Sequence, residues 1–380
     1  SALGLLLSLT RVDFGINSLT RTIPSSLGSL TALTVLAVYT NSLTGSIPAE
    51  LGSLLSVTFL SIGTNQLVGE LPSSLGLLST ISILVANKNC LSGSLPASLG
   101  CLTAVKRLRL ESNSFTNSIP PSLGAMLSIT FLDLELNRLV GPIPSSFGSL
   151  SALQLLSLNH NSLTGSIPSS LGSLSSFTFL DVAVNSLTGT IPPKLGCLSA
   201  LLVLRLDTNL FNGTLPPSLG SLSVLQSLLL ASNGLSGVVP DEICSASALT
   251  SMQFNANSGL LCYPSCLTSM GAELVVGSAF EGCPTAAPTG EPSGQPSAVP
   301  TQPSGQPSGQ PSSFPTAEPT QLPSGQPTSQ PTRVPTGAPT GQPSGQPSGV
   351  PTCQPSGQPT SQPTGFPSGQ PSGEPTGVPS

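Results

Sequence analysis

Residues 153–174 read LQLLSLNHNSLTGSIPSSLGSL, and this stretch contains the pattern on which most of the chain is built. Asn161 lies within it, and an Asn recurs every 24 residues on both sides. The eleven positions are Asn17, Asn41, Asn65, Asn89, Asn113, Asn137, Asn161, Asn185, Asn209, Asn233 and Asn257. An unbroken interval of this kind predicts one supersecondary unit stacked repeatedly on itself. The sequence therefore predicts a solenoid.

Apolar residues keep fixed distances from each Asn. Leu153, Leu156 and Leu158 precede Asn161, and Leu163 follows it. The spacing L-x-x-L-x-L-x-x-N-x-L predicts a short strand, whose inward residues alternate, and then a tight turn at the Asn. The Asn amide has two donors and an acceptor, so it can satisfy backbone groups of its own coil and of the next one. We therefore predict a structural ladder of amides formed by Asn41, Asn65, Asn89, Asn113, Asn137, Asn161, Asn185, Asn209 and Asn233.

The second half of the unit, LTGSIPSSLG, contains Gly165 and Pro168. Pro fixes φ and removes a backbone donor, which predicts an extended piece and a short helical turn rather than a central strand. Taken together, these residues resemble the plant-type leucine-rich repeat of receptor-like kinase ectodomains and polygalacturonase-inhibiting proteins, over about residues 3–262. The resemblance implies an α/β solenoid: a curved repeat with a parallel concave sheet and short 3-10 or extended convex segments.

The composition changes at residue 284, where Pro begins to recur mostly every fourth residue in units such as PSGQ and PTSQ. Such a segment cannot bury a core, so we expect a disordered Pro-rich stalk over residues 284–380, similar to arrays in predicted algal surface proteins. We expect a solenoid over residues 1–243 and a last coil with a cysteine-containing cap over residues 244–283. Ser1 falls in mid-coil, so we expect the N-terminal cap to be missing and the chain to be a piece of a longer secreted protein. Any signal peptide, membrane anchor or kinase beyond either end is left open.

Four cysteines follow the last regular coil, and the resemblance implies that they cap it: Cys244, Cys262, Cys266 and Cys283. We expect them to be oxidised in a secretory compartment, but their three possible pairings stay open. The sequence also leaves open whether Cys353 cross-links chains. Asn212 begins the N-x-[ST] triplet of the chain and is a candidate glycosylation site.

Composition and motifs exclude several classes of function. Charged residues are only 7% of the chain, the net charge is −5, and basic residues form no long runs, so nucleic-acid binding is not expected. No apolar run approaches the ~18–20 residues that span a bilayer, so a membrane would be reached only through other parts of the full-length chain. With one His, no G-x-S-x-G motif and no C-x-x-C spacing, we predict no enzyme activity, cofactor or metal site.

Side chains six, four and two residues before each Asn should point outward and form the concave face. Neighbouring coils lie about 4.8 Å apart, so Arg109 should face Asp133, and Asp181 should face Arg205. We expect exposed Phe side chains to serve as anchors, and we expect the carboxylates to be solvated, without a pocket that separates their pKa values. The candidate partner-binding residues are Tyr39, Phe59, Arg107, Arg109, Glu111, Phe131, Asp133, Glu135, Phe179, Asp181, Arg205 and Asp207.

An open concave face joined to a spacer indicates a non-catalytic extracellular or cell-surface module that recognises a protein or polysaccharide. Three alternatives stay open: the ectodomain of a receptor-like signalling protein, an inhibitor of a secreted hydrolase, and a structural component of the cell wall. The sequence does not identify the ligand.

Overall fold

The computed structural model describes residues 2–269, 271, 273–276 and 281–283. The predicted stalk over residues 284–380, with Cys353, lies outside the described residues. In the described part of the chain, no helix has the length and hydropathy needed to cross a membrane.

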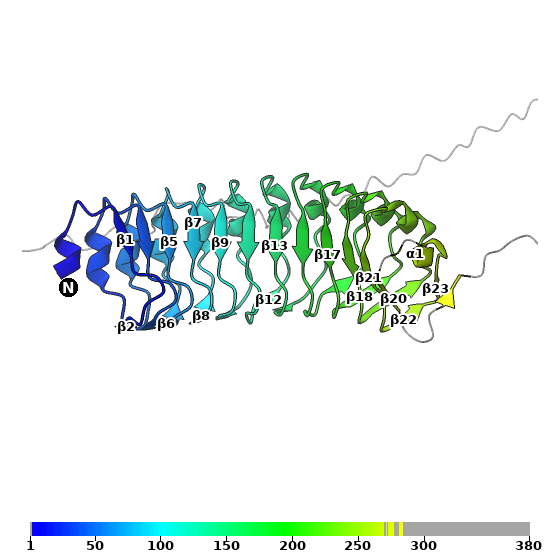
Figure 1. Cartoon of the computed structure of the whole chain (residues 1–380), viewed down its shortest axis with the longest axis horizontal. Coiled ribbons are helices and arrows are strands. Elements are labelled where there is room, and N and C mark those ends of the chain that lie inside the picture. The colour runs from blue at the N-terminus through cyan, green and yellow to red at the C-terminus, as the bar shows by residue number, and fades with distance from the viewer. Residues whose placement is uncertain (1, 270, 272, 277–280, 284–380) are drawn as a thin grey trace, which may run out of the picture. The chain divides into compact units, whose positions relative to one another are not determined.

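One strand from each coil contributes to a parallel sheet of twelve strands, which follow one another in chain order (Figure 1). The middle residue of each strand from β1 to β21, such as Leu132 and Leu156, points inward and is buried, whereas its two neighbours face outward. In β24 the middle residue, Leu274, is half-buried. The strands of this main sheet are β1 (Arg11–Asp13), β3 (Val35–Ala37), β5 (Phe59–Ser61), β7 (Ile83–Val85), β9 (Arg107–Arg109), β11 (Phe131–Asp133), β13 (Leu155–Ser157), β15 (Phe179–Asp181), β17 (Val203–Arg205), β19 (Ser227–Leu229), β21 (Ser251–Gln253) and β24 (Glu273–Val275).

Shorter parallel strands follow the Asn turns and form separate small sheets along one edge (Figure 1). Five of them pair in the first half of the solenoid: β2 (Thr20–Arg21), β4 (Ser42–Gly45), β6 (Gln66–Glu70), β8 (Cys90–Ser94) and β10 (Ser114–Thr116). The next pair is β12 (Val140–Gly141) with β14 (Ser162–Leu163). Four more pair further on: β16 (Thr188–Gly189), β18 (Leu210–Gly213), β20 (Asn233–Gly237) and β22 (Asn257–Leu260). We refer to these strands together as the edge sheets.

A 3-10 turn closes the back of each coil, and a Pro with extended backbone precedes every turn from η2 onward; Pro168, for example, has φ −63° and ψ 125°. The turns are η1 (Ala2–Leu5), η2 (Ser25–Ser29), η3 (Ala49–Ser53), η4 (Ser73–Leu77), η5 (Ala97–Cys101), η6 (Pro121–Ala125), η7 (Ser145–Ser149), η8 (Ser169–Ser173), η9 (Pro193–Cys197), η10 (Pro217–Ser221) and η11 (Asp241–Ser245). The structure confirms the predicted solenoid, with a parallel sheet on one side and 3-10 turns on the convex side.

The Gly within each 3-10 turn is required by close stacking. A Cβ built on Gly172 would lie 2.2 Å from the carbonyl oxygen of Lys194 in the next coil. Cys244 occupies the same position of the repeat in the final turn. At this position the Cys244 side chain forms a disulfide bond with Cys266.

Cys262 pairs with Cys283. One disulfide therefore ties the last 3-10 turn to the segment that follows the regular coils, and the other lies within that segment. The short helix α1 (Cys266–Ser269) lies between them, and β23 (Cys262–Tyr263) pairs with β25 (Glu281–Gly282). Leu267 of α1 is fully buried. The cysteine-containing segment therefore covers apolar side chains at the end of the core.

Each ladder Asn bonds to backbone groups of its own coil and of the preceding coil, rather than of the next coil as predicted. Asn161 Nδ2 donates to the carbonyl oxygens of Leu134 in the preceding coil and of Leu158 in its own, and its Oδ1 accepts the N–H of Leu139. Equivalent bonds recur at every ladder position from Asn41 to Asn257, for example at Asn65. The side chain of Asn17, among the residues that the structure describes, donates only to carbonyl oxygens of its own turn.

The residue before each Asn has left-handed backbone, with φ between 51° and 56°, although none of these residues is Gly. They are Ile16, Thr40, Thr64, Lys88, Ser112, Leu136, His160, Val184, Thr208, Ser232 and Ala256. Left-handed backbone costs an L-residue roughly 1–2 kcal/mol. The amide ladder must therefore offset a strain repeated in every coil.

Candidate functional site

Eight of the twelve candidate partner-binding residues lie in strands of the main sheet, and the other four, Tyr39, Glu111, Glu135 and Asp207, follow a strand end by two residues. Arg107, Phe131 and Phe179 begin their strands, and Asp133 and Asp181 end theirs. Strand register places Phe131 between Arg107 and Leu155, and Asp133 between Arg109 and Ser157. The face is therefore continuous across coils, but its side chains are packed more closely than the sequence indicates.

The aromatic residues are less accessible than expected. Phe59, Phe131 and Phe179 are half-buried rather than exposed, and so is Tyr39. A Cβ built on Gly15 would lie 2.5 Å from the ring of Tyr39, so this ring lies over the neighbouring coil. Parallel strands bring same-position side chains close enough to cover one another, which lowers their exposure. The expectation of fully exposed anchors is corrected accordingly.

Carboxylates on this face are buried, contrary to the expectation that they are solvated. Only 7% of Asp133 and 2% of Asp181 is exposed. Burial raises the pKa of Asp133 to about 7, with the nearby Glu111 carboxylate as the next cause, while a hydrogen bond from the Glu135 N–H opposes the rise. Burial also raises the pKa of Asp181, against the opposing effects of the Ala183 N–H and the Arg205 guanidinium. The crowding of neighbouring side chains is the physical reason for the difference.

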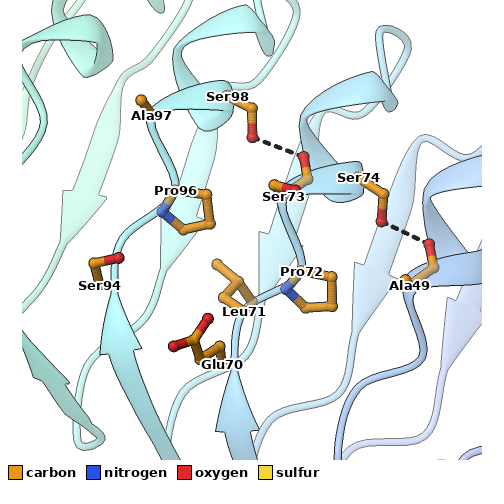
Figure 2. A pocket seen from close by; sticks show the side chains of 10 residues that line it. All are labelled: Ala49, Glu70, Leu71, Pro72, Ser73, Ser74, Ser94, Pro96, Ala97 and Ser98. Carbon is orange, nitrogen blue, oxygen red and sulfur yellow. Dashed lines mark hydrogen bonds between the residues drawn. The ribbon is translucent and has the colours of Figure 1, made fainter. Parts of the chain in front are cut away.

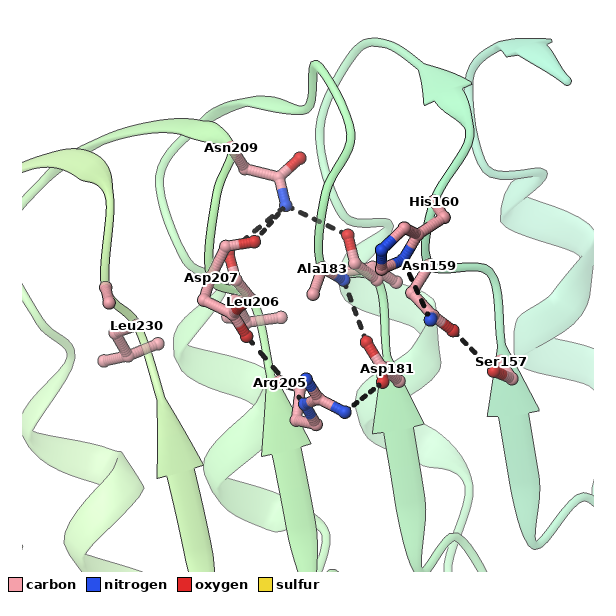
Figure 3. Close-up of polar contacts among 12 residues, drawn as sticks. Ser157, Asn159, His160, Asp181, Ala183, Arg205, Leu206, Asp207, Asn209 and Leu230 are labelled. Atoms are coloured by element: carbon pink, nitrogen blue, oxygen red, sulfur yellow. Dashed lines mark hydrogen bonds and ion pairs between the residues drawn. The ribbon is translucent and has the colours of Figure 1, made fainter. Parts of the chain in front are cut away.

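Arg205 lies between two carboxylates (Figure 3). Its Nη1 is 3.0 Å from Asp181 Oδ2, and its Nε is 3.9 Å from Asp207 Oδ1. The N–H of Ala183 also donates to Asp181 Oδ1 at 3.0 Å. This group of Asp181, Arg205 and Asp207, which we call the paired cluster, has two acidic groups around one basic group.

A second cluster lies on β9, β11 and the residues that follow them. Register opposes Arg109 to Asp133, but the guanidinium of Arg109 pairs with Glu111, two residues further along its own chain. Glu111 Oε1 also accepts a 2.6 Å hydrogen bond from Asn87 Nδ2. We call Glu111, Asp133 and Glu135 the acidic cluster. Of these three carboxylates, Glu111 alone forms an ion pair with an Arg among the described residues.

Sequence reasoning did not select three buried polar residues of this face, Asn87, Ser157 and Asn159. Ser157 Oγ donates to Asn159 Oδ1 at 2.7 Å (Figure 3). The same Oγ is 3.4 Å from Glu135 Oε2. The 24-residue interval itself could have found the two amides. Asn87 and Asn159 lie one repeat before Glu111 and one repeat after Glu135.

Grooves between neighbouring convex turns repeat along the solenoid. One is lined by Glu70, Pro72 and Pro96, and Ser98 Oγ donates across its edge to the carbonyl oxygen of Ser73 at 2.7 Å (Figure 2). A similar groove lies between residues 22–26 and 46–50. Because the same groove recurs with the repeat, it results from the geometry of the coils. We therefore do not treat it as a specific binding site.

The family models that match are Leucine Rich Repeat, over residues 104–126, 128–150, 152–174 and 224–246, and PT disordered repeat, over residues 322–357 and 351–380. No match was found among curated protein sequences.

Several solved structures resemble the chain. The ectodomain of the Arabidopsis receptor kinase HAESA, in complex with an IDA peptide hormone ligand, is 30% identical with a TM-score of 0.65, and the match covers 73% of this chain and 51% of that one. The plant peptide hormone receptor RGFR1, in complex with RGF2, is 29% identical with a TM-score of 0.60, covering 74% and 57%. A plant ice-binding protein is 25% identical with a TM-score of 0.57, covering 73% and 84%.

The chain spans about half the length of the receptor structures that it matches. The repeat models fall on the Asn-containing coils, and the receptor ectodomains share their fold. The chain is thus a leucine-rich repeat protein that resembles plant receptor ectodomains and carries a tail matching the PT disordered repeat.

Proposed function

We propose that the solenoid is a non-catalytic extracellular recognition domain that binds an extended peptide across the outward face of its main sheet. The observation that carries this proposal is the combination of half-buried aromatic side chains and buried carboxylates on one continuous face. Binding energy in interfaces is concentrated in aromatic and charged anchors of this kind. The two disulfides support a location in an oxidising, extracellular compartment.

A peptide is favoured over a glycan because two of the similar ectodomains hold peptide hormones. An extended chain rises about 3.3 Å per residue, so a short peptide would cross several strands spaced about 4.8 Å apart. A role in receptor-like signalling is consistent with peptide binding by this face. An inhibitor of a hydrolase would use the same face to bind a different partner, and a structural component of the wall would not need the face.

Binding of the full chain to a library of extended dodecapeptides and to a panel of cell-wall oligosaccharides tests this function. Phe131→Ser with Phe179→Ser removes two anchors and should weaken peptide binding at least tenfold. Val140→Ser is the matched control, because Val140 is exposed on an edge sheet. Equal binding by both variants would contradict the use of the main sheet. Capture of oligosaccharides alone would assign the face to glycans.

A second candidate function concerns the edge sheets, and we propose it on account of their regular hydroxyl side chains. Thr20, Thr44, Thr164 and Thr188 occupy equivalent outward positions and are exposed. Strand register pairs Thr20 with Ser42 and Thr188 with Leu210, so residues one repeat apart lie two positions out of register on neighbouring strands. The only charged residue at the first or third position after a ladder Asn is Arg138. A regular, weakly charged surface suits an ordered lattice of water, and one of the similar structures is a plant ice-binding protein.

Inhibition of ice recrystallisation by the full chain tests this candidate. Thr164→Lys with Thr188→Lys should abolish the inhibition, whereas Phe131→Ser on the other face should leave it unchanged. Asn212, the proposed glycosylation site, is exposed on β18 of the same edge. A glycan on Asn212 would cover part of this surface, so Asn212→Gln is compared with the glycosylated protein. If neither the glycosylated protein nor Asn212→Gln inhibits ice recrystallisation, ice binding by the edge sheets is excluded.

A further inference from the structure

We propose that the end of the peptide ligand that lies over β3, β5 and β7 is apolar, and that its charged residues lie over the strands from β9 to β17. This inference rests on the proposed peptide-binding function and assigns the order of side chains along the ligand. It is carried by the uneven distribution of charge on the outward face, by a continuous row of apolar side chains, and by a comparison with two later strands of the same sheet.

Charge is unevenly distributed along the outward face of the main sheet. Each repeat contributes three outward residues to this face, six, four and two positions before its ladder Asn. None of the nine outward residues in the repeats of β3, β5 and β7 is charged, whereas eight of the fifteen in the repeats of β9, β11, β13, β15 and β17 are charged. The eight are Arg107, Arg109, Glu111, Asp133, Glu135, Asp181, Arg205 and Asp207. A charged ligand group over the first three of these strands would lose water without gaining a partner on this face.

The uncharged part of the face contains five large apolar or aromatic side chains, which we call the apolar segment: Val35, Tyr39, Phe59, Ile83 and Val85. All five are half-buried, so each keeps apolar surface that a ligand can cover. Strand register pairs Phe59 with Val35 on one side and with Ile83 on the other, which makes the row continuous across three strands. An apolar ligand side chain placed on this row would remove both surfaces from water.

Tyr39 lies over the preceding coil because Gly15 leaves space for its ring. A Cβ built on Gly15 would lie 2.5 Å from that ring. Gly63, at the same position of the following repeat, leaves space for Asn87 in the same way, since a Cβ there would lie 2.1 Å from Asn87 Oδ1. The ring of Tyr39 therefore extends the apolar segment towards β1.

The large apolar side chains are not required to build a sheet of this kind. Strand β19 pairs with β17 and with β21 in the same parallel register as the earlier strands. Leu229 is nevertheless the single large apolar residue among the six outward residues in the repeats of β19 and β21. The six are Ser227, Leu229, Ala231, Ser251, Gln253 and Asn255. Pairing of the strands thus leaves the apolar segment unexplained, whereas contact with an apolar ligand accounts for it.

The dimensions of the sheet set the length of each part of the ligand. Strands lie about 4.8 Å apart and an extended peptide rises about 3.3 Å per residue, so about three residues would cross from β3 to β7. The five strand spacings from β7 to β17 correspond to about seven residues. Both signs of charge are present on the strands from β9 to β17, so the longer part of the ligand should contain acidic as well as basic residues.

The test uses the full chain and three acetylated, amidated dodecapeptides of identical composition. Two block peptides carry all their valine, isoleucine and phenylalanine residues at the N-terminal or at the C-terminal end, and the third peptide spaces them evenly among its lysine, glutamate and serine residues. One block peptide should bind at least tenfold more tightly than the evenly spaced peptide.

The double variant Ile83→Ser with Val85→Ser should remove this preference, because it removes apolar surface from the apolar segment. Leu229→Ser is the matched control and should preserve the preference. Leu229 occupies the same position of its repeat as Val85 and is also half-buried, but it lies outside the apolar segment. Circular dichroism confirms that each variant is folded.

A second readout separates this inference from the proposed function. Benzyl alcohol, a small apolar probe, is titrated while methyl groups are followed by NMR, and it should shift the signals of Val35, Ile83 and Val85 more than those of Leu229. If benzyl alcohol does so but no peptide binds, the apolar segment stands as a binding surface and the peptide function fails. If all three peptides bind equally, or if Leu229→Ser removes the preference as fully as the double variant, the inference is overturned while the peptide function stands. Equal shifts at Leu229 and at the apolar segment also count against the inference.

Discussion

Asn161 Nδ2 and the carbonyl oxygen of Leu134 are joined by a 3.0 Å hydrogen bond, although the two residues are 27 positions apart in the sequence. The bond crosses from one coil to the preceding one. It is accompanied by bonds to Leu158 in the same coil and from the N–H of Leu139. One side chain thus satisfies backbone groups in separate turns of the chain.

Asn161→Ala should lower the free energy of unfolding by about 1–3 kcal/mol, because it leaves partly buried backbone groups without partners. Asn17→Ala is the matched control, because Asn17 is exposed and, within the described residues, its side chain donates only to the carbonyl oxygens of Phe14 and Gly15. Chemical denaturation followed by circular dichroism measures both. Equal losses at the two positions would show that the ladder adds nothing beyond its own turn.

Val184→Asn should stabilise the protein by about 1 kcal/mol. Val184 has φ 53°, a conformation that β-branched residues adopt poorly and that Asn adopts more readily. Val203→Asn is the control, because Val203 lies within the regular strand β17, where Asn is disfavoured. We expect thermal melting to move upward for the first variant and downward for the second. A lower melting temperature for Val184→Asn would mean that contacts of the Val side chain outweigh the backbone strain.

Gly172→Ala should destabilise the solenoid by about 2 kcal/mol or more, since its Cβ would meet the carbonyl oxygen of Lys194 and neighbouring coils would have to separate. Ser173→Ala, at the adjacent exposed residue, should be nearly neutral. Thermal denaturation compares the two. A neutral Gly172→Ala would indicate that adjacent 3-10 turns can move apart without cost.

Asp133→Asn should change how stability depends on pH. Between about pH 4 and pH 7, native Asp133 holds a proton that the unfolded chain releases, because its pKa is raised from 3.8 to about 7. The contribution of Asp133 to the free energy of unfolding therefore falls as the pH rises through this range. The variant should remove this fall and be more stable than wild type at pH 8, by on the order of 1 kcal/mol. Urea denaturation at pH 5 and pH 8 measures it.

Glu135→Gln is the comparison for that experiment, because Glu135 is half-buried and lies beside Asp133. It should have a smaller effect on the difference between the two pH values. If Asp133→Asn and wild type lose the same stability between pH 5 and pH 8, the carboxyl of Asp133 is not the group that titrates.

The repeat could be predicted closely from the sequence because each coil uses the same physical solution. Apolar residues at fixed distances from Asn161 define the inward positions, and Pro168 precedes a 3-10 turn as expected. The left-handed residue before each Asn could not be predicted in this way. Val184 and Ile16 give no local signal for that conformation, which the surrounding ladder imposes.

The side-chain contacts of the candidate site could be predicted less well from the sequence. The 24-residue interval places Arg109 opposite Asp133, and the strand register agrees. The guanidinium of Arg109 nevertheless forms its ion pair with Glu111, two residues further along the same segment. The choice between these partners depends on side-chain geometry that the repeat does not encode. Burial of Asp133 and Asp181 likewise results from the packing of neighbouring coils, so a single coil gives no indication of it.

The 3-10 turns and main-sheet strands that contact one another come from successive coils. A modular chain of this kind can gain or lose whole 24-residue units without rebuilding its remaining contacts. Each such change would alter the distance between the acidic cluster and the paired cluster, or between either cluster and the disulfide-bonded end. The spacing of recognition groups along the ligand is thus a quantity that evolution can adjust in discrete steps, while the chemistry of each group stays the same.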